Sequence, residues 1–524
     1  MAEIKDNLPN LPEKWRWSRI KDISIRMQSG GTPSTKKPEY YENGTIPFVK
    51  IEDMSGSKKF LFQTKERITQ DGLENSSAWK IPVNSILYSM YGSYGISIIN
   101  KIEVASNQAI LGIIPDETII NLNYLYYALV NLKPSLSKYH RGTTQLNLNA
   151  HIVQNLYIPV PPLQIQTIIV KKIEELETRL DKGVENLSSS LILLNHYRNA
   201  LLKHAIKGRL TEAWRKQHGH ELEPGSVLLK RILDERRTRW DEQKSTELKQ
   251  KGKNPKNDDW KNKFKAPNIP NLEKSFPIPD LWTWGTIDQI SAPVNHSLTD
   301  GPFGSDLKTS HYTDNGPRVI RLQNIGDGVF NDEIAHISEE HYNELINHRI
   351  FAGDIVLASL GEKLPKCCIV PDYVGPAIVK ADCIRFKVND KISTKYVNYI
   401  LNSLPIQKLT ESLIHGVGRP RLGLTLIRSI SIPIPPYFEQ LEIVQELEKK
   451  MAFIPSIEAD LILILKKSKI LYQSILKKAF EGRLINSITS ICPEKDIIND
   501  KTSKKSSTSD NMADKNQKKL TDYL

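Results

Sequence analysis

An internal repeat constrains the fold of this chain more than any other feature of its sequence. The segment IPVPP at residues 158–162 returns as IPIPP at 432–436, an offset of 274 residues. The same offset carries AIKGRL at 205–210 onto AFEGRL at 479–484, and Gln166 onto Gln440. Nearer the N-terminus the matches shift to offsets of 267 and 272 residues, as insertions in loops would produce. A period this long predicts two domain-sized copies, not a solenoid of short repeats.

Each copy begins with a segment whose pattern predicts a mixed globular module, at roughly 11–157 and 278–431. Short β-rich runs predict strands, and Asn-Gly pairs at 43–44 and 315–316 predict turns. Helical stretches are expected near 122–132 and 394–404. The segments expected along the chain are a first globular domain at 1–160, a long helix at 161–210, a basic helical and linker region at 211–275, a second globular domain at 276–435, a second long helix at 436–485, and a disordered polar tail at 486–524.

A long helical pattern follows each proline run. Apolar residues recur every three or four positions, so each helix carries one narrow stripe that cannot be buried alone. Because each copy offers just one such stripe, we expect the two helices to pair, although two core helices of separate bundles would give the same pattern. The residues expected at the pairing face are Ile169, Ile173, Leu176, Leu180, Leu187, Leu191, Leu194, Val444, Leu447, Met451, Leu461, Leu465 and Ile475.

Each of the two helical patterns contains a helix-breaking residue. Gly183 and Pro455 lie near their middles, and Pro455 predicts a kink or break because proline lacks a backbone donor and clashes with the preceding turn. Gly208 and Gly482 lie where C-terminal caps are expected.

Charge and cysteine content exclude several classes of protein. The chain holds 72 Lys and Arg against 60 Asp and Glu, a net charge of +12 that agrees with a polyanionic partner but is shared by many cytosolic proteins. Much of this surplus lies in residues 203–265. The four cysteines form neither a disulfide framework nor a CxxC pair, so a zinc knuckle is not expected. With no apolar leader and no run long enough to span a bilayer, a cytoplasmic protein is expected.

Three short motifs resemble catalytic or metal sites without meeting their requirements. The segment IPPY at 434–437 resembles the (N/D/S)PPY loop of amino-methyltransferases, but Ile434 has no polar side chain to hold a target amine. Asp306 and Lys308 match the short nuclease pattern (D/E)xK, which occurs by accident in many basic proteins. His341, Glu344 and His348 do not have the HExxH spacing of zinc proteases. We therefore expect a protein that binds and organises, with no catalytic residue and no metal site.

The order of module, Pro-rich segment and long helix ending in Gly-Arg-Leu, all repeated, resembles the specificity subunit of type I restriction–modification systems. The family's P-x-P-P-x-x-x-Q pattern is present at 159–166 and 433–440. The segments GGTPS at 30–34 and GPFGS at 301–305 resemble early loops of the family's target recognition domains, and 142–145 and 416–421 resemble late ones. The basic middle region resembles the extended central region of some members.

The resemblance implies an α+β fold: two similar mixed α/β target recognition domains joined by two long helices that form an antiparallel coiled coil, with pseudo-two-fold internal symmetry. It implies a DNA-binding subunit that reads a bipartite, asymmetric site in double-stranded DNA, one domain per half-site. Two methyltransferase subunits, and restriction subunits, would be its partners. S-adenosylmethionine, and ATP with Mg²⁺, would be bound by those partners, and this chain would hold no cofactor.

The candidate DNA-binding residues are polar and basic groups in or near the Gly-rich loops. Arginine grips guanine at two points, glutamine grips adenine, and lysine more often holds phosphate. Each also has a simpler reading as a solvated surface group. The candidates are Lys36, Lys37, Arg141, Thr143 and Gln145 in the first domain, and Lys308, Arg321, Gln323, Arg419 and Arg421 in the second. Trp15, Trp17, Trp282 and Trp284 recur in both copies, so we expect them to be packing residues.

Two other functions share these sequence features. A stand-alone nucleic-acid-modifying enzyme, either nuclease or methyltransferase, would explain the charge, and a coiled-coil scaffold that does not bind nucleic acid would explain the helices. The bases recognised, the spacer between half-sites and the presence of a restriction subunit are not specified by the residues.

Overall fold

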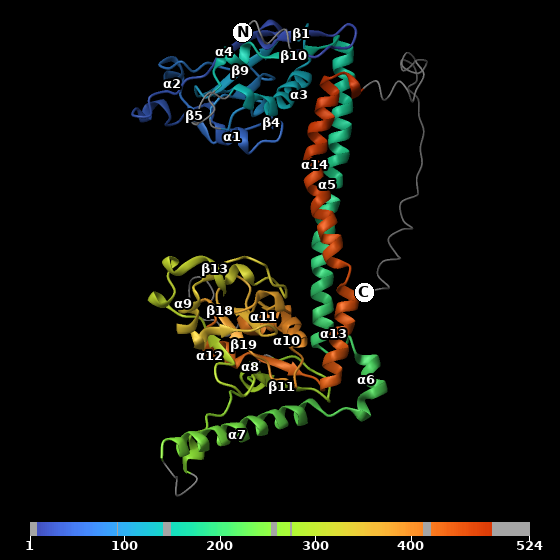
Figure 1. Cartoon of the computed structure of the whole chain (residues 1–524). Coiled ribbons are helices and arrows are strands. Elements are labelled where there is room, and N and C mark those ends of the chain that lie inside the picture. Colours follow the sequence, from blue (N-terminus) through green and yellow to red (C-terminus); the bar gives the residue numbers. More distant parts are fainter. Residues whose placement is uncertain are drawn as a thin grey trace. The chain divides into compact units, whose positions relative to one another are not determined.

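The computed structural model describes residues 8–91, 93–139, 148–252, 259–272, 275–411 and 421–484. Its contacts divide the chain into two compact units, Met1–Leu187 with Leu463–Leu524, and Ser188–Ile462. The boundaries fall inside the long helices, so each unit contains one globular module and parts of helices from both repeats (Figure 1).

Unit 1 contains two sheets beside a short two-stranded ladder. The larger sheet has the strand order β2-β9-β6-β7-β4, and the smaller sheet has the order β5-β3-β8. The strands of these sheets are β2 (Ser24–Ser29), β3 (Ile46–Val49), β4 (Phe60–Leu61), β5 (Glu66–Ile68), β6 (Ile86–Ser89), β7 (Ser97–Asn100), β8 (Ala105–Ser106) and β9 (Ile110–Pro115). The short helices of the module are α1 (Ile51–Ser55), α2 (Gln70–Glu74), α3 (Leu122–Leu132) and α4 (Ala150–Gln154).

Unit 2 repeats this arrangement. Its sheets have the orders β12-β19-β16-β17 and β14-β13-β18-β15. Their strands are β12 (Leu298–Asp300), β13 (Tyr312–Ile320), β14 (His336–Ile337), β15 (Arg349–Ile350), β16 (Ile355–Ala358), β17 (Cys367–Ile369), β18 (Ala377–Val379) and β19 (Cys383–Phe386). The helices of the module are α8 (Ile287–Ile290), α9 (Glu339–Glu344), α10 (Thr394–Leu401), α11 (Leu404–Glu411) and α12 (Leu424–Ser429).

The two modules share one topology. The order β2-β9-β6-β7 corresponds to β12-β19-β16-β17, with antiparallel pairing throughout both sets. The order β5-β3-β8 corresponds to β14-β13-β18, and in each the central strand has one antiparallel and one parallel neighbour. Unit 1 adds β4 at one sheet edge and unit 2 adds β15 at another. The internal repeat is therefore a repeat of fold, although few side chains match.

A two-stranded ladder joins each module to its long helix. In unit 1, β1 (Arg16–Arg19) pairs with β10 (Tyr157–Val160), and in unit 2, β11 (Thr283–Thr286) pairs with β20 (Ser431–Ile434). The register is the same in both, because Trp17 lies opposite Pro159 and Trp284 lies opposite Pro433. Proline cannot donate to a ladder, but a two-stranded ladder leaves its second edge free for such residues.

Tyrosine and glutamine side chains fix this ladder to the module in both repeats. The Tyr124 hydroxyl donates to the Pro159 carbonyl at 2.8 Å, and the Tyr396 hydroxyl donates to the Pro433 carbonyl at 2.9 Å. Gln166 is fully buried and its amide oxygen accepts from the Asn121 backbone N–H at 2.7 Å, where Asn121 caps α3. Gln440 makes the same contact with the N–H of Ser393, the cap of α10, at 2.9 Å.

The long helices differ in continuity. Helix α5 (Leu163–Ile206) is unbroken, whereas its counterpart is split into α13 (Tyr437–Met451) and α14 (Ile454–Phe480). The break expected from Pro455 is present, and the proline lies in the first turn of α14, where its missing N–H leaves no helical hydrogen bond unmade. The expectation that Gly183 is a breaker is wrong, because one glycine lowers helix stability by only about 1 kcal/mol.

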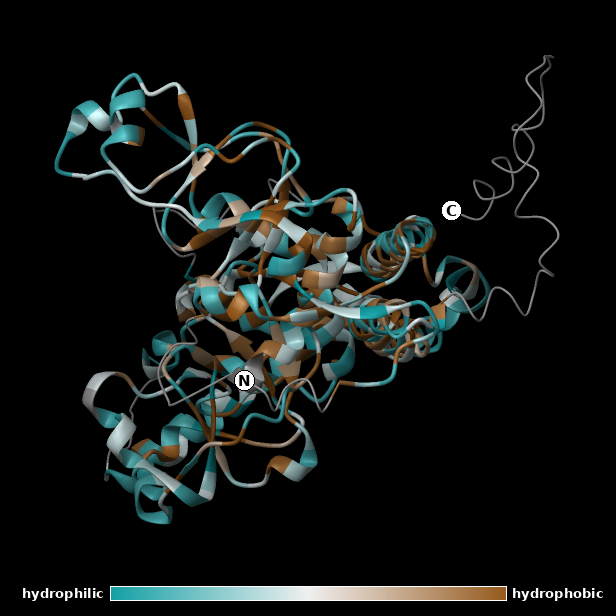
Figure 2. Cartoon of the chain, turned by 90° about the horizontal axis from the view of Figure 1, so that it is seen from above, coloured by the Kyte–Doolittle hydropathy of each residue, from teal (hydrophilic) through white to brown (hydrophobic). Residues whose placement is uncertain are grey.

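The helices pair in antiparallel fashion within each unit. In unit 1, Ile169 and Ile173 near the start of α5 share a core with Leu476 and Ala479 near the end of α14. In unit 2, the other end of α5 shares a core with α13. Figure 2 shows hydrophilic and hydrophobic residues alternating around the two long helices seen nearly end-on. This is the predicted fold class, two mixed α/β modules joined by an antiparallel coiled coil.

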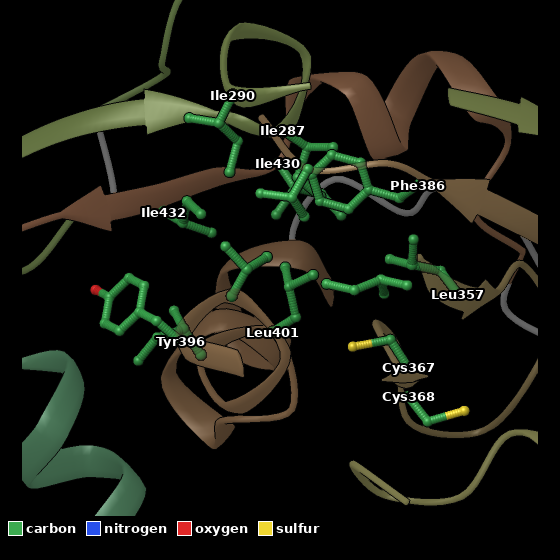
Figure 3. Close-up of a cluster of buried hydrophobic side chains, with 14 of the residues drawn as sticks. Ile287, Ile290, Leu357, Cys367, Cys368, Phe386, Tyr396, Leu401, Ile430 and Ile432 are labelled. Atoms are coloured by element: carbon green, nitrogen blue, oxygen red, sulfur yellow. The ribbon is translucent and has the colours of Figure 1, made fainter. Parts of the chain in front are cut away.

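The core of each module is completed by a helix end from the other repeat. Leu201, Leu202, Ala205 and Ile206 of α5 belong to the core of the second module. In the first module, the ring of Phe480 from α14 packs 5.1 Å from that of Tyr124. Figure 3 shows the second core, where Tyr396 and Leu401 of α10 belong to one cluster with Phe386, Leu357 and Ile432 of β20. Neither repeat therefore buries its core with its own residues alone.

The basic central region contains a further helix packed on unit 2. Helix α6 (Glu212–His218) precedes α7 (Gly225–Gln250), and both lie in the basic helical and linker region expected at 211–275. Leu228 and Ile232 of α7 are fully buried against the second module. Much of its charge is paired along the helix, as in Arg237 with Asp241 at 3.2 Å and Arg239 with Glu235 at 2.6 Å.

One predicted turn is wrong. Asn43 has the left-handed backbone expected of an Asn-Gly turn, with φ of 58°. Asn315 and Gly316, however, lie within β13, where the register with β14 shifts between Thr313 and Arg318. The Asn-Gly pair at 315–316 therefore marks a strand irregularity and not a turn. Turns and β-bulges can both use a glycine with positive φ, as Gly316 has here.

Candidate nucleic-acid interface

The first Gly-rich loop lies against the end of β8. The Gly31 N–H donates to the Ser106 carbonyl at 2.9 Å, and a Cβ on Gly30 would lie 2.0 Å from that same oxygen. Only glycine therefore fits there. The next residue, Thr32, is exposed and its hydroxyl donates to the Gln108 amide oxygen at 2.6 Å. The loop is held firmly at its base and presents polar groups at its tip.

Lys36 and Lys37 follow this loop and are both exposed. The Lys37 ammonium donates to the Tyr40 hydroxyl at 3.0 Å and lies 5.0 Å from the centre of that ring. This hydrogen bond raises the pKa of Lys37, so the group stays charged at neutral pH. The structure thus presents two cations beside the loop, as a phosphate-binding surface requires.

The second module repeats the close approach of loop and strand. A Cβ on Gly301 would lie 2.2 Å from the carbonyl carbon of Lys380, just after β18, which corresponds to β8. Phe303 of this loop is half exposed, and the Arg421 guanidinium lies 6.0 Å from its ring centre. Arg421 also forms an ion pair with Asp382 at 3.3 Å and bridges to Leu360. The loop at 301–305 and Arg421, the described residue of the late loop, therefore meet.

The other candidates in this module differ in exposure. Lys308 and Gln323 are exposed. Arg321 is half buried, donates from one terminal nitrogen to the Ile334 carbonyl at 3.4 Å, and has a buried Nε that meets no hydrogen-bond partner among the described residues. Arg321 is thus partly built into the fold, while Lys308, Gln323 and Arg421 present exposed surface. Arg141, Thr143, Gln145 and Arg419 lie outside the described residues.

The predicted pairing residues lie toward the helix interface. Every one is buried or half buried, whereas neighbours such as Leu193 and Leu463 are 67% and 47% exposed. Arg198 and Glu458 add an ion pair of 3.2 Å between α5 and α14.

The recurring tryptophans have packing roles in the structure. Trp282 is 5% exposed, and its indole N–H donates to the Glu439 carboxylate at 2.8 Å. Trp284 packs edge-on to Phe276 with centroids 5.0 Å apart, and the Trp17 indole donates to the Pro9 carbonyl at 3.0 Å.

Several residues at these sites have little or no signal in the sequence. Tyr124 and Tyr396 carry no motif beyond their equivalent position in the two expected helical stretches. Gln108 lies in a turn between strands and belongs to no motif. Phe303 lies between the two glycines of the loop at 301–305, and a large apolar side chain at such a position is the one sequence feature that indicates a role for it.

The histidines of the His341–His348 motif make contacts within the fold. The His341 ring pairs with Glu344 at 3.0 Å, and His348 contacts the Asp300 carbonyl at 2.7 Å. Among the described residues, no group of three His, Cys, Asp or Glu side chains is placed to hold a metal ion. Within the same residues, no helix combines the length and apolar character needed to span a bilayer.

The chain is similar to proteins of known type. The profile of the type I restriction modification DNA specificity domain matches residues 12–187 and 308–466, more than half of the chain. The EcoBI specificity subunit of Escherichia coli is 23% identical over 474 residues, covering 89% of this chain and 86% of that protein. The MjaVIII specificity subunit of Methanocaldococcus jannaschii is 23% identical over 447 residues, covering 84% and 86%.

A solved structure has the same fold. This structure concerns complex assembly and conformational transition of the type I R-M system. The match covers 91% of this chain and 100% of the solved chain, with a TM-score of 0.62 and 15% sequence identity.

Two similar modules with loop-borne cations, carried on paired helices, define the class of a DNA-reading protein with two recognition domains. The chain belongs to the family of type I restriction modification DNA specificity domains. Its role is that of the specificity subunit of such a system.

Proposed function

We propose that the chain reads a bipartite, asymmetric site in double-stranded DNA, with target recognition domains at 1–160 and 276–435 each taking one half-site. The observation that carries this proposal is the contrast between scaffold and loops. The Tyr–Pro and Gln–cap contacts recur in both modules with distances that agree within 0.2 Å, whereas the exposed groups on the loops differ. A shared scaffold with unlike loops suits two different half-sites.

In this proposal Lys36, Lys37 and Lys308 hold phosphates, and Gln323 and Arg421 contact base edges. Arg141, Thr143, Gln145 and Arg419 remain candidates by sequence, and Arg321 supports the loop as well as offering a contact. The spacer helices at 161–210 and 436–485 set the unread interval between half-sites, and the region at 211–275 forms the central part.

The chain acts without catalysing a reaction and docks two methyltransferase subunits, with restriction subunits where the system has them. Those partners bind S-adenosylmethionine, ATP and Mg²⁺. Apolar side chains on the outer faces of the helices support partner docking, since Ile470 and Leu471 of α14 are 70% and 51% exposed. The cytoplasm, where DNA and these partners meet, is the setting that the proposal requires.

The test is DNA binding by the chain copurified with its methyltransferase subunit, on the site found by methylation mapping. Arg421→Ala should weaken binding by about 1–3 kcal/mol and relax base preference within one half-site only. Lys308→Ala should weaken binding to all sequences and lower the slope of log affinity against log salt by about one. Lys387→Ala, at an exposed lysine after β19, is the control and should change neither.

Two further assays, the first on the chain purified without partners, separate the alternatives. Purified chain incubated with plasmid, Mg²⁺ and S-adenosylmethionine should neither cleave nor methylate, and robust activity without partners would favour a stand-alone enzyme. Binding that does not depend on salt would favour a scaffold with no phosphate contacts.

A further inference from the structure

Each unit contains a pocket where its module meets the C-terminal end of a long helix. In unit 2 a pocket of about 590 Å³ is lined by residues of α5, α11 and the segment before β11. In unit 1 a pocket of about 280 Å³ is lined by residues of α14, α3, β10 and the segment before β1.

The two pockets occupy equivalent positions in the repeat. Lys203 and Lys207 line the second pocket, and their counterparts at an offset of 274 residues, Lys477 and Glu481, line the first. Leu404 corresponds in the same way to Leu132 at an offset of 272 residues. The pockets are therefore part of the repeated architecture and not accidents of loop packing.

Charge distinguishes the two pockets. Lys203, Lys207 and Lys408 surround the second pocket, which has no acidic lining residue among those described. None of these lysines forms an ion pair with a carboxylate in the described part of the chain, and Lys207 lies 5.6 Å from the centre of the Phe276 ring. In the first pocket Glu481 is paired with Lys477 at 3.9 Å and with Arg483 at 3.4 Å, so positive charge there is largely neutralised.

Helix stability does not account for the lysines of the second pocket. A helix dipole favours cations in the last turn, which suits Lys203 and Lys207. Lys408 lies on another helix, however, and the second repeat has Glu481 at the position that corresponds to Lys207. The fold is thus indifferent to the sign of this charge, which leaves the cations available to a ligand.

Part of the lining of the second pocket is apolar. Phe276, Leu404 and Leu409 line it, and Leu404 is 38% exposed. Phe276 is fixed by its edge-on contact with Trp284. A lining that combines apolar side chains with three lysines fits a large apolar side chain flanked by carboxylates, as on a short protein segment.

We propose that this pocket docks an acidic segment of a partner protein that inserts one large apolar side chain between Lys203, Lys207 and Lys408. The inference rests on the proposed function, in which the partner is a methyltransferase subunit, and names the chemistry of one contact. DNA is the poorer occupant because its backbone offers phosphates and no apolar group for Phe276 and Leu404. Helix α11, which contributes to the pocket lining, also lies on the side of the module away from α9 (Figure 1).

The test measures binding of the methyltransferase subunit to full-length K203E/K207E/K408E by titration calorimetry at several salt concentrations. Reversal of three charges should weaken binding of the methyltransferase subunit by about tenfold at low salt, with a smaller difference at high salt. Lys387→Glu makes the same kind of charge change elsewhere in unit 2 and should leave affinity within about twofold of wild type. Glu481→Lys in the first pocket should strengthen binding there.

Folding and function are tested separately. Thermal unfolding of the triple variant should match the wild type, and Lys207→Gln should weaken binding less than Lys207→Glu. Affinity of the triple variant equal to that of wild type, while wild-type complex selects a split DNA site, would overturn the pocket inference and leave the proposed function intact. Loss of DNA binding with unchanged affinity for the methyltransferase subunit would assign the pocket to DNA and contradict the proposal. A wild-type chain that binds neither the methyltransferase subunit nor DNA would instead defeat the proposed function.

Discussion

Gln166 and Gln440 show why the family pattern ends in glutamine. Each side chain is fully buried and joins the segment after the ladder to the cap of a module helix. Each amide nitrogen donates back to a proline carbonyl, at 2.8 Å for Pro161 and 2.9 Å for Pro435. An amide suits this position because it both donates and accepts. The side chain therefore fixes the direction in which the long helix leaves its module.

Gln166→Leu should destabilise unit 1 by about 3 kcal/mol, because the Asn121 N–H and two carbonyl groups lose a buried partner. Gln164→Leu on the exposed face of the same helix is the matched control and should stay within about 0.5 kcal/mol. Thermal and denaturant unfolding measure both. Equal effects of the two substitutions would show that the buried amide has no structural role.

The reactivity of three cysteines tests the packing of the second core. Cys367, Cys368 and Cys383 are buried, and burial raises the pKa of all three thiols, that of Cys368 to about 12. Only the thiolate reacts with alkylating reagents. At a pH of about 8, below the pKa of an ordinary thiol, the native protein should leave these three unmodified by iodoacetamide in peptide mass spectrometry, while the unfolded protein is modified at each. Rapid modification of Cys367 in the native protein would contradict the packing around α10.

Residue roles are only partly predictable from the sequence. The glutamines stand out as a motif and the recurring tryptophans indicate packing, but nothing singles out the tyrosines. A tyrosine in an amphipathic stretch has no local pattern that reveals a distant carbonyl partner. Base contacts are still harder to predict from the sequence, because loop side chains serve ligand binding and are not required by the fold.

At the scale of elements, glycine has opposite consequences along one helix. Gly183 lies inside α5, where a Cβ would meet no described atom within 4 Å other than its chain neighbours and the backbone of its own helix, and the helix continues through it. Gly208 ends the same helix with φ of 68°, and a Cβ there would lie 2.4 Å from the Cγ of Pro279. Gly482 and Pro12 repeat this contact at 2.3 Å. The glycine caps therefore bring each helix end against the proline that begins a module.

Gly208→Ala should destabilise unit 2 by about 2–4 kcal/mol, through left-handed backbone strain and the clash with Pro279. Gly183→Ala should instead stabilise the chain by up to about 1 kcal/mol, because alanine is the better helix former. Calorimetric unfolding gives both signs in one experiment. Stabilisation by Gly208→Ala would show that the cap is not formed.

Element positions follow from the sequence where the pattern is long or chemically restricted. Helix α3 occurs at the residues where its pattern predicts it, and the break before Pro455 follows from proline geometry. The prediction for Gly183 fails because propensity is small beside the packing of a long helix. The prediction for the Asn-Gly pair at 315–316 fails because a positive φ serves bulges as well as turns.

At the scale of the whole molecule, repetition makes the architecture predictable. Two copies each with one unpartnered apolar stripe imply a helix pair, and the fold contains it. The strand orders cannot be predicted from the sequence, because local pattern does not specify which strands become neighbours. The exchange of helix ends between module cores is also beyond local pattern, because α5 and α14 contribute to cores far from them in sequence.

The central claim is that two modules of one fold read two different halves of one DNA site. Its most direct measurement is methylation of a random-sequence duplex library by the chain reconstituted with its methyltransferase subunit. Sequencing of the methylated fraction should give two short specified segments separated by a fixed unspecified interval, and Arg421→Ala should degrade preference in one segment only. A single continuous motif, or loss of preference in both segments together, would contradict the account.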